Sequence, residues 1–114
     1  MAYDEALAGR IRDMVSARSD VTERKMFGGI AWMLGGNMAL GVLGGDVLVR
    51  LERDDAQRAL AEPDTRVFDM TGRPAPNMVV VAGSSVADDA ALARWVDAGA
   101  DHAASLPPKA PKKG

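Results

Sequence analysis

The chain contains no cysteine, one histidine and few aromatic residues, and each of these shortages excludes a class of chemistry. Without cysteine, the protein forms no disulfide framework, thiolate zinc site, iron–sulfur cluster or cysteine nucleophile. A single histidine, His102, does not by itself supply a metal site of the imidazole type. His102 stands at no motif spacing from a nucleophile or a second ligand, so we expect it at the surface or half-buried.

Long apolar runs and phosphate-binding loops are also missing. No apolar run approaches the roughly 20 residues that span a bilayer, and no signal-peptide pattern opens the chain. We therefore expect a soluble, cytoplasmic protein without a membrane partner. The glycines form no G-x-G-x-x-G or P-loop pattern. Their pairs lead into strands, whereas phosphate loops lead into a helix N-terminus.

Carboxylates occur in pairs at Asp54-Asp55 and Asp88-Asp89. Both pairs stand at predicted helix starts, where capping and the helix dipole explain them. Nothing marks either pair as a general acid and base. The sequence thus predicts a non-enzymatic protein with no catalytic residue, no metal and no cofactor.

The length of 114 residues is that of one domain, and 47% hydrophobic with 26% charged residues is a globular composition. The formal net charge is −2, yet residues 107–114 carry three lysines and no acid, so residues 1–106 hold five more acidic than basic side chains. We expect one domain over residues 1–106 and a flexible Pro/Lys-rich tail over 107–114. The acidic body disfavours nucleic acid as a partner.

Hydrophobic periodicity changes along the chain. Apolar residues from Tyr3 to Val15 recur at helical spacing, which predicts a helix over residues 3–17. Three apolar runs follow at 26–34, 37–43 and 46–51, with paired glycines between them. Paired glycines favour two-residue hairpin turns, so these runs predict a three-stranded antiparallel meander.

The second half of the chain alternates between helical and strand patterns. It predicts helices over 54–62 and 87–105, strands over 67–70 and 78–82, and an exposed loop over 71–76. The order becomes α-β-β-β-α-β-β-α. We expect an α+β fold whose antiparallel sheet is built around the meander and flanked by the N- and C-terminal helices.

The meander also holds the candidate contact residues. Gly28-Gly29 lies inside a predicted strand, which indicates a bulge or the close approach of another backbone. Arg24-Lys25 precede these glycines, and Arg50 and Arg73 add positive charge elsewhere in the chain. These cations form either a solvated edge with ordinary ion pairs or a surface for an acidic partner or a phosphate.

The methionines and Trp32 leave two interpretations. Seven methionines are a high number; their default role is to fill the core, and the alternative is an adaptable binding surface. Trp32 and Met33 point to opposite faces of their strand. One of these faces is then expected to carry apolar surface for a partner or a second copy.

Several segments, in order, resemble the N-terminal domain of the TfoX/Sxy family. They are residues 24–33, 36–38, 46–50, 68–74, 92–96 and 105–109, so the match spans about residues 3–109. The resemblance implies an α+β domain in a family named for bacterial regulators of natural competence. Those regulators have a second domain, whereas this chain resembles a single-domain member. The family lends no catalytic residues.

We therefore predict a non-enzymatic regulatory or adaptor domain that binds a protein partner, with its own copy as one possibility. The candidate contact residues are Arg24, Lys25, Phe27, Gly28, Gly29, Trp32, Arg50 and Arg73. Two alternatives remain open. One is a nucleic-acid accessory domain that uses the arginines and the lysine tail, and the other is an enzyme or small-molecule module with a site near Gly28, Arg50 and Arg73.

Overall fold

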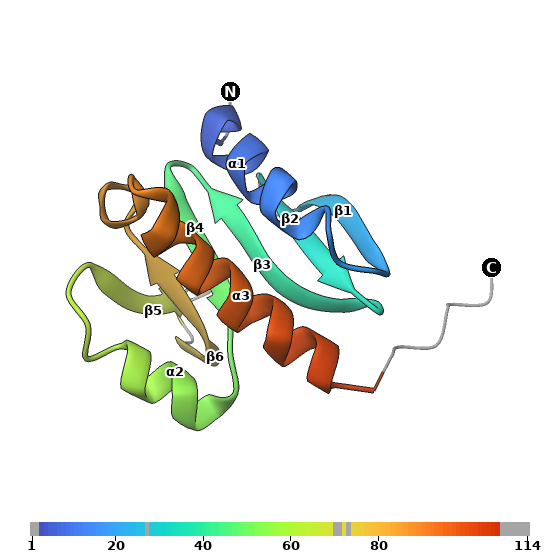
Figure 1. Cartoon of the computed structure of the whole chain (residues 1–114). Coiled ribbons are helices and arrows are strands. Elements are labelled where there is room, and N and C mark those ends of the chain that lie inside the picture. The colour runs from blue at the N-terminus through green and yellow to red at the C-terminus, as the bar shows by residue number, and fades with distance from the viewer. Residues whose placement is uncertain (1–2, 27, 70–71, 73, 108–114) are drawn as a thin grey trace.

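The protein is described by a computed structural model, which places residues 3–26, 28–69, 72 and 74–107. The described residues form three α-helices and a six-stranded sheet, whose arrangement can be followed in Figure 1. In chain order the elements are α1 (Glu5–Val15), β1 (Val21–Met26), β2 (Gly29–Leu34), β3 (Asn37–Leu43), β4 (Asp46–Arg50), α2 (Arg53–Ala59), β5 (Thr65–Asp69), β6 (Pro74–Val81), the short 3₁₀ helix η1 (Gly83–Val86) and α3 (Asp89–Ser105).

The α+β fold expected from the sequence is confirmed. All strand pairs are antiparallel, in the spatial order β1-β2-β3-β4-β6-β5, and the predicted meander is β2-β3-β4. Residues 108–114 of the expected tail lie outside the described residues.

One strand, β1, was not predicted. Its sequence, VTERKM, is polar at its centre, and residues 22–25 are exposed on both faces, so no apolar alternation marks it. The run 26–34 is therefore the end of β1, a turn and β2. Met26 pairs with Gly29, and Gly28 lies in the turn between the two strands.

The expected bulge at Gly28-Gly29 is wrong, because Gly28 occupies this turn with a φ of +74°. The close backbone approach expected as the alternative is found at Gly29, where a Cβ atom would collide with the carbonyl oxygen of Val42. A register shift occurs instead in the pairing of β2 with β3, between Trp32 and Met33.

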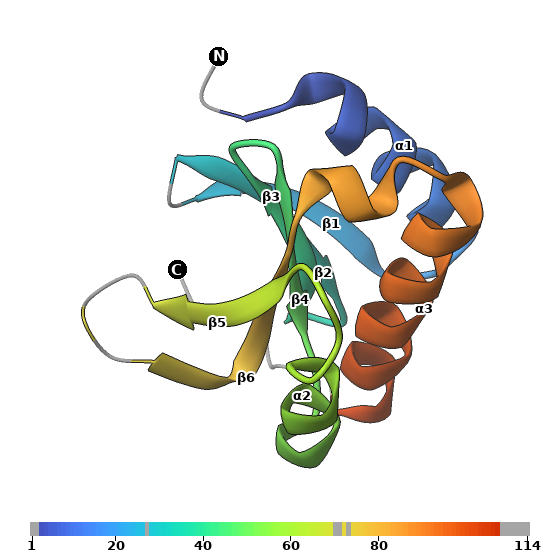
Figure 2. The ribbon, with the colours of Figure 1, turned by 90° about the vertical axis from the view of Figure 1, so that its left-hand side faces the viewer.

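Helices α1 and α3 cover one face of the sheet (Figure 2). The contact is closest at Gly99 of α3. A Cβ atom there would lie 2.6 Å from the carbonyl oxygen of Ala39 and 3.2 Å from side-chain carbons of Leu40 and Val49. The side chains of Leu40 and Val49 therefore face the helices. Because side chains alternate across a strand, these two residues show which side of the strands lies under the helices. This inner face and the helices build the main core.

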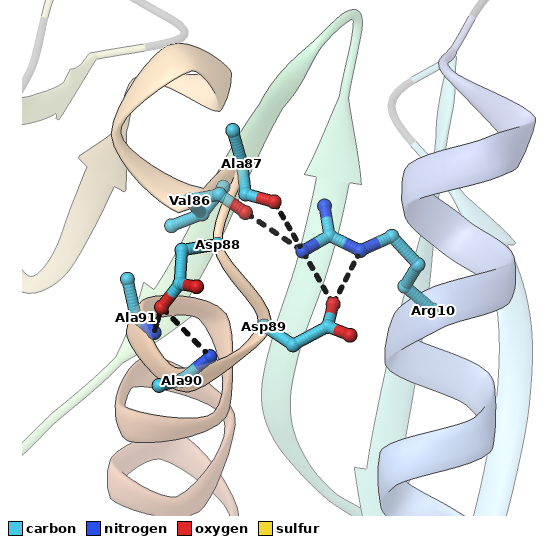
Figure 3. A network of polar contacts seen from close by, with 7 residues as sticks. All are labelled: Arg10, Val86, Ala87, Asp88, Asp89, Ala90 and Ala91. Carbon is cyan, nitrogen blue, oxygen red and sulfur yellow. Dashed lines mark hydrogen bonds and ion pairs between the residues drawn. The ribbon is translucent and has the colours of Figure 1, made fainter.

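Arg10 joins the middle of α1 to the start of α3 (Figure 3). Its guanidinium donates to the carbonyl oxygens of Val86 and Ala87 at 2.9 and 3.1 Å and to the carboxylate of Asp89 at 2.8 and 3.0 Å. Asp88 caps α3 by accepting from the amides of the next turn. One side chain thus fixes both the backbone before α3 and the helix itself against α1.

We expect Gly99→Ala to lower the free energy of unfolding by about 1–3 kcal/mol, because the added methyl group overpacks the contact between α3 and β3. Gly9→Ala is the matched control: Gly9 lies within α1 and has nothing within 4 Å of an added Cβ. That substitution should raise the stability by about 0.4–1 kcal/mol. Urea unfolding measures both, and equal effects would contradict the close contact at Gly99.

Candidate functional site

The sheet face opposite α1 and α3, called here the outer face, carries no helix (Figure 2). Ala31, Leu48 and Val80 point to this face, because they alternate with the residues that face the helices. They expose 1–4% of their surface yet lie outside the main core cluster. Half-buried apolar side chains share the face with them, namely Met26, Met33, Met38, Leu43 and Met78.

The core-filling role expected for the methionines does not hold for the four on this face. Met26, Met33, Met38 and Met78 are each only partly buried, and none belongs to the main core. Met14, on α1, is also partly buried but packs against the core. The outer face therefore presents a layer of unbranched, polarisable side chains that can adapt to a partner's shape.

Trp32 is not a surface contact residue, which corrects the expectation from the sequence. It points to the inner face and exposes only 1% of its surface. Its indole N–H donates to Oε1 of Glu23 at 3.1 Å, and the same oxygen accepts from Nε of Arg12 at 2.7 Å. Trp32 thus ties β2 to β1 and α1, while its neighbour Met33 takes the outward position.

The contacts of Glu23 give a pH-dependent test. The hydrogen bond from Arg12 is the main cause that lowers the pKa of Glu23 below its ordinary value of 4.5; burial opposes it, and the indole of Trp32 adds a smaller lowering effect. Because the folded pKa is depressed, this stabilisation is present above the unfolded value and is lost as pH falls through the folded value.

We expect the Nε1–H NMR resonance of Trp32 to stay constant at neutral pH and to shift when acid protonates Glu23 below pH 4.5. Glu23→Gln removes the titrating group, so the same resonance should stay flat over that range. An identical acid shift in the wild type and in Glu23→Gln would contradict the assignment.

Positive charge lies at both edges of the outer face. The registers place Arg24, Ala31, Gly41, Leu48, Val80 and Arg66 in one row across the six strands. Arg66 is neutralised by Asp46 at 3.2 Å, the one ion pair on this face among the described residues. Arg50 lies on β4 in the next row, about 14 Å across the sheet from Arg24 at the usual strand spacing.

Arg24, Lys25 and Arg50 form no ion pair with any carboxylate in the part of the chain that the structure describes. Arg24 and Arg50 share the outer face, whereas Lys25 points to the other side of β1. These three cations, predicted as contact residues, are thus available to an external anion. Sequence reasoning missed Met26, Leu43 and Arg66; the alternation along each strand would have placed them here once the strands were known.

Of the predicted site near Gly28, Arg50 and Arg73, the two described residues lie far apart. Gly28 lies in the turn beyond the row that contains Gly29 and Asp46, and Arg50 is four residues further along β4. That separation is about 13 Å along the strand, so Gly28 and Arg50 lie toward opposite ends of the sheet. Arg73, like Phe27, lies outside the described residues.

Two hollows lie on the helical side. One, of about 670 Å³, lies between α1 and β1-β2, and its arginines, Arg12 and Arg18, are both ion-paired. The other, of about 680 Å³, lies between α2 and α3, with Trp95 and half-buried His102 in its wall. Neither contains an unpaired arginine or lysine, so the outer face remains the best candidate for an interaction surface.

The described residues hold no group of three acidic or histidine side chains that could bind a metal ion. Within the same residues, no helix combines the length and the apolar character needed to cross a bilayer. Asp54 and Asp55 lie in the first turn of α2, and Asp88 caps α3, as expected for the paired carboxylates.

Of three comparisons with known proteins, one finds a match. A search of curated proteins and of solved structures finds no match to the chain. A family model described as the TfoX N-terminal domain matches residues 13–103, which include every strand of the sheet and most of α3. The chain therefore belongs to the TfoX N-terminal domain family.

Proposed function

We propose that this domain is a non-enzymatic adaptor that acts in the cytoplasm by binding a protein partner through its outer face. One observation carries the proposal. Arg24 and Arg50 form no ion pair with a described carboxylate, and they lie on a face that also carries four half-buried methionines and Leu43, on a domain with an excess of acidic residues. An isolated positive, apolar surface on an acidic body is complementary to an acidic, apolar surface.

The energetics of the face suit binding. Partly exposed methionines gain free energy when a partner removes them from water, at roughly 25 cal/mol per Å² of apolar surface. Their flexible side chains repack against different shapes. The unpaired arginines supply orientation, because each can form two parallel hydrogen bonds to a carboxylate.

The other ion pairs of the described residues lie away from this face. They connect α1 or its flanking residues with β1 or α3, link α3 to the end of α2, or lie within α2. Most arginines on the helical side are thus paired in contacts that hold the fold. The outer face differs from it, because two of its three described arginines have no such structural role.

We expect Arg50→Glu to reduce partner capture at least about tenfold, because the reversed charge meets the partner's acid. In the experiment, the immobilised domain is incubated with an extract of the source cell, and each retained protein is quantified. Arg53→Glu is the matched control: Arg53 is also unpaired and exposed, but it lies on α2. A specific partner is retained by the wild type and Arg53→Glu and is lost with Arg50→Glu. Equal retention by both variants would contradict the proposal.

The same variants separate protein from nucleic acid as the partner. Fluorescence anisotropy with duplex and single-stranded probes at low and moderate salt should show no binding that depends on Arg50. Binding that falls steeply with salt and is lost with Arg50→Glu would overturn the protein proposal in favour of nucleic acid.

A further inference from the structure

We infer that the free edge of β1 binds an acidic extended segment of the partner as a seventh strand of the sheet. The inference rests on the proposed function and names the way in which the partner is held. It has two independent supports. One is the direction of the backbone groups of β1, and the other is the pair of unneutralised cations on this strand.

The backbone of β1 offers a regular set of free hydrogen-bonding groups. Hydrogen-bonded and non-hydrogen-bonded pairs alternate along an antiparallel ladder. The amide of Gly35 donates to the carbonyl of Asp20 at 3.1 Å, so Asp20 and Gly35 form a hydrogen-bonded pair. The next pair along the strands, Val21–Leu34, is therefore a non-hydrogen-bonded pair. The even-numbered residues of β1 therefore bond to β2. The odd-numbered ones, Val21, Glu23 and Lys25, direct their N–H and C=O groups away from the sheet.

Two features leave this edge available. β1 is the first strand of the sheet order, with no described strand on its other side, and residues 22–25 are exposed. Its register with β2 is unbroken over all six pairs, so no bulge turns the edge away. Addition of a strand to such an edge is an established mode of peptide recognition, in which main-chain bonds give affinity and side chains give specificity.

The charges on the edge select an acidic segment. Arg24 and Lys25 are adjacent in sequence, so their side chains project to opposite faces of β1. Neither forms a direct ion pair among the described residues, and the charge of Lys25 acts on Glu23, two residues away on the same face, without such a contact. Two consecutive acidic residues on an added strand would project in the same alternating way and would place one carboxylate opposite each cation.

The other edge of the sheet, β5, fits this role less well. Its register with β6 shifts between Val67 and Phe68, which interrupts the row of outward groups. Its one cation, Arg66, is already paired with Asp46. An acidic strand would therefore gain less at β5 than at β1.

A second copy of this chain fits the edge of β1 less well than an acidic strand. Two copies paired antiparallel through their outward residues have two registers with the greatest overlap. One places Glu23 opposite Glu23, and the other places Arg24 opposite Arg24 between two Glu23–Lys25 pairs. Each of these registers contains a like-charge pair, whereas an acidic strand places an opposite charge at both Arg24 and Lys25.

The test uses the end-blocked peptide Thr-Val-Asp-Glu-Val-Thr as the probe and the whole chain as the receptor. With peptide in excess, amide hydrogen exchange at Val21, Glu23 and Lys25 should slow several-fold, because these N–H groups become bonded. Exchange at Thr22, Arg24 and Met26 should stay the same, because their N–H groups already bond to β2. Unchanged exchange at the three odd-numbered residues would overturn the inference.

Variants separate strand addition from simple charge attraction. The double variant Arg24→Glu with Lys25→Glu should bind the peptide at least about tenfold more weakly, from the loss of two cross-strand charge pairs. Arg53→Glu should bind it like the wild type. A peptide whose Asp amide nitrogen is methylated keeps its charge but loses a main-chain bond to the outward groups of β1, so it should also bind several-fold more weakly. Equal binding of the methylated and unmethylated peptides would overturn strand addition.

The outcome of the peptide experiment does not depend on the outcome of the capture experiment that tests the proposed function. Arg50 lies on β4, remote from the edge, and is not needed for strand addition. If the peptide binds with the expected exchange pattern but Arg50→Glu leaves partner capture unchanged, strand addition at β1 is supported and binding through the outer face is contradicted. If the peptide does not bind but Arg50→Glu abolishes partner capture, binding through the outer face is supported and strand addition is contradicted.

Discussion

Helix α3 lies against the backbone of β3 at Gly99, and the arrangement of the other elements depends on this close contact. Because glycine has no side chain, the helix comes within van der Waals distance of the carbonyl of Ala39. The helix then fits between the side chains of Leu40 and Val49 and leaves room for α1 beside it. Both long helices are thereby held on one side of the sheet, and the other side is left without a helical cover (Figure 2).

The two faces of the sheet consequently use apolar residues in different ways. The inner face is built from branched residues and Trp32, buried under α1 and α3. The outer face buries small or compact residues, such as Ala31 and Val80, beside half-exposed methionines. Branched side chains have few rotamers and define a core, whereas methionine has many and tolerates varied neighbours. The inner face of the sheet therefore serves folding with a closely packed core, and the outer face is adaptable for contact with a partner.

Much of the fold could be predicted from the sequence, because the meander has strong local signals. Gly35-Gly36 and Gly44-Gly45 supply the conformations that two-residue turns require, and the strands between them alternate clearly. β1 gave no such signal, since its central residues are exposed on both faces. Without β1, Gly28 was misread as part of a strand, whereas it lies in the turn between β1 and β2.

The candidate site was only partly predictable. Arg24, Lys25 and Arg50 could be recognised as cations, but only the structure shows that they lack partners while Arg66 has one. Trp32 was predicted to be a surface contact. Alternation shows that Trp32 and Met33 face opposite sides of the sheet, but it does not show which side the helices cover. That choice depends on tertiary contacts, here the position of α3.

The two arginines that connect α1 to α3 have a consequence for the order in which the chain assembles. Arg10 binds the backbone at Val86 and Ala87, and Arg18 binds Asp97 and Asp101, so both links join residues more than 70 positions apart. During synthesis α1 emerges more than 70 residues ahead of these anchoring groups, so the contacts of Arg10 and Arg18 form only after all six strands have been made.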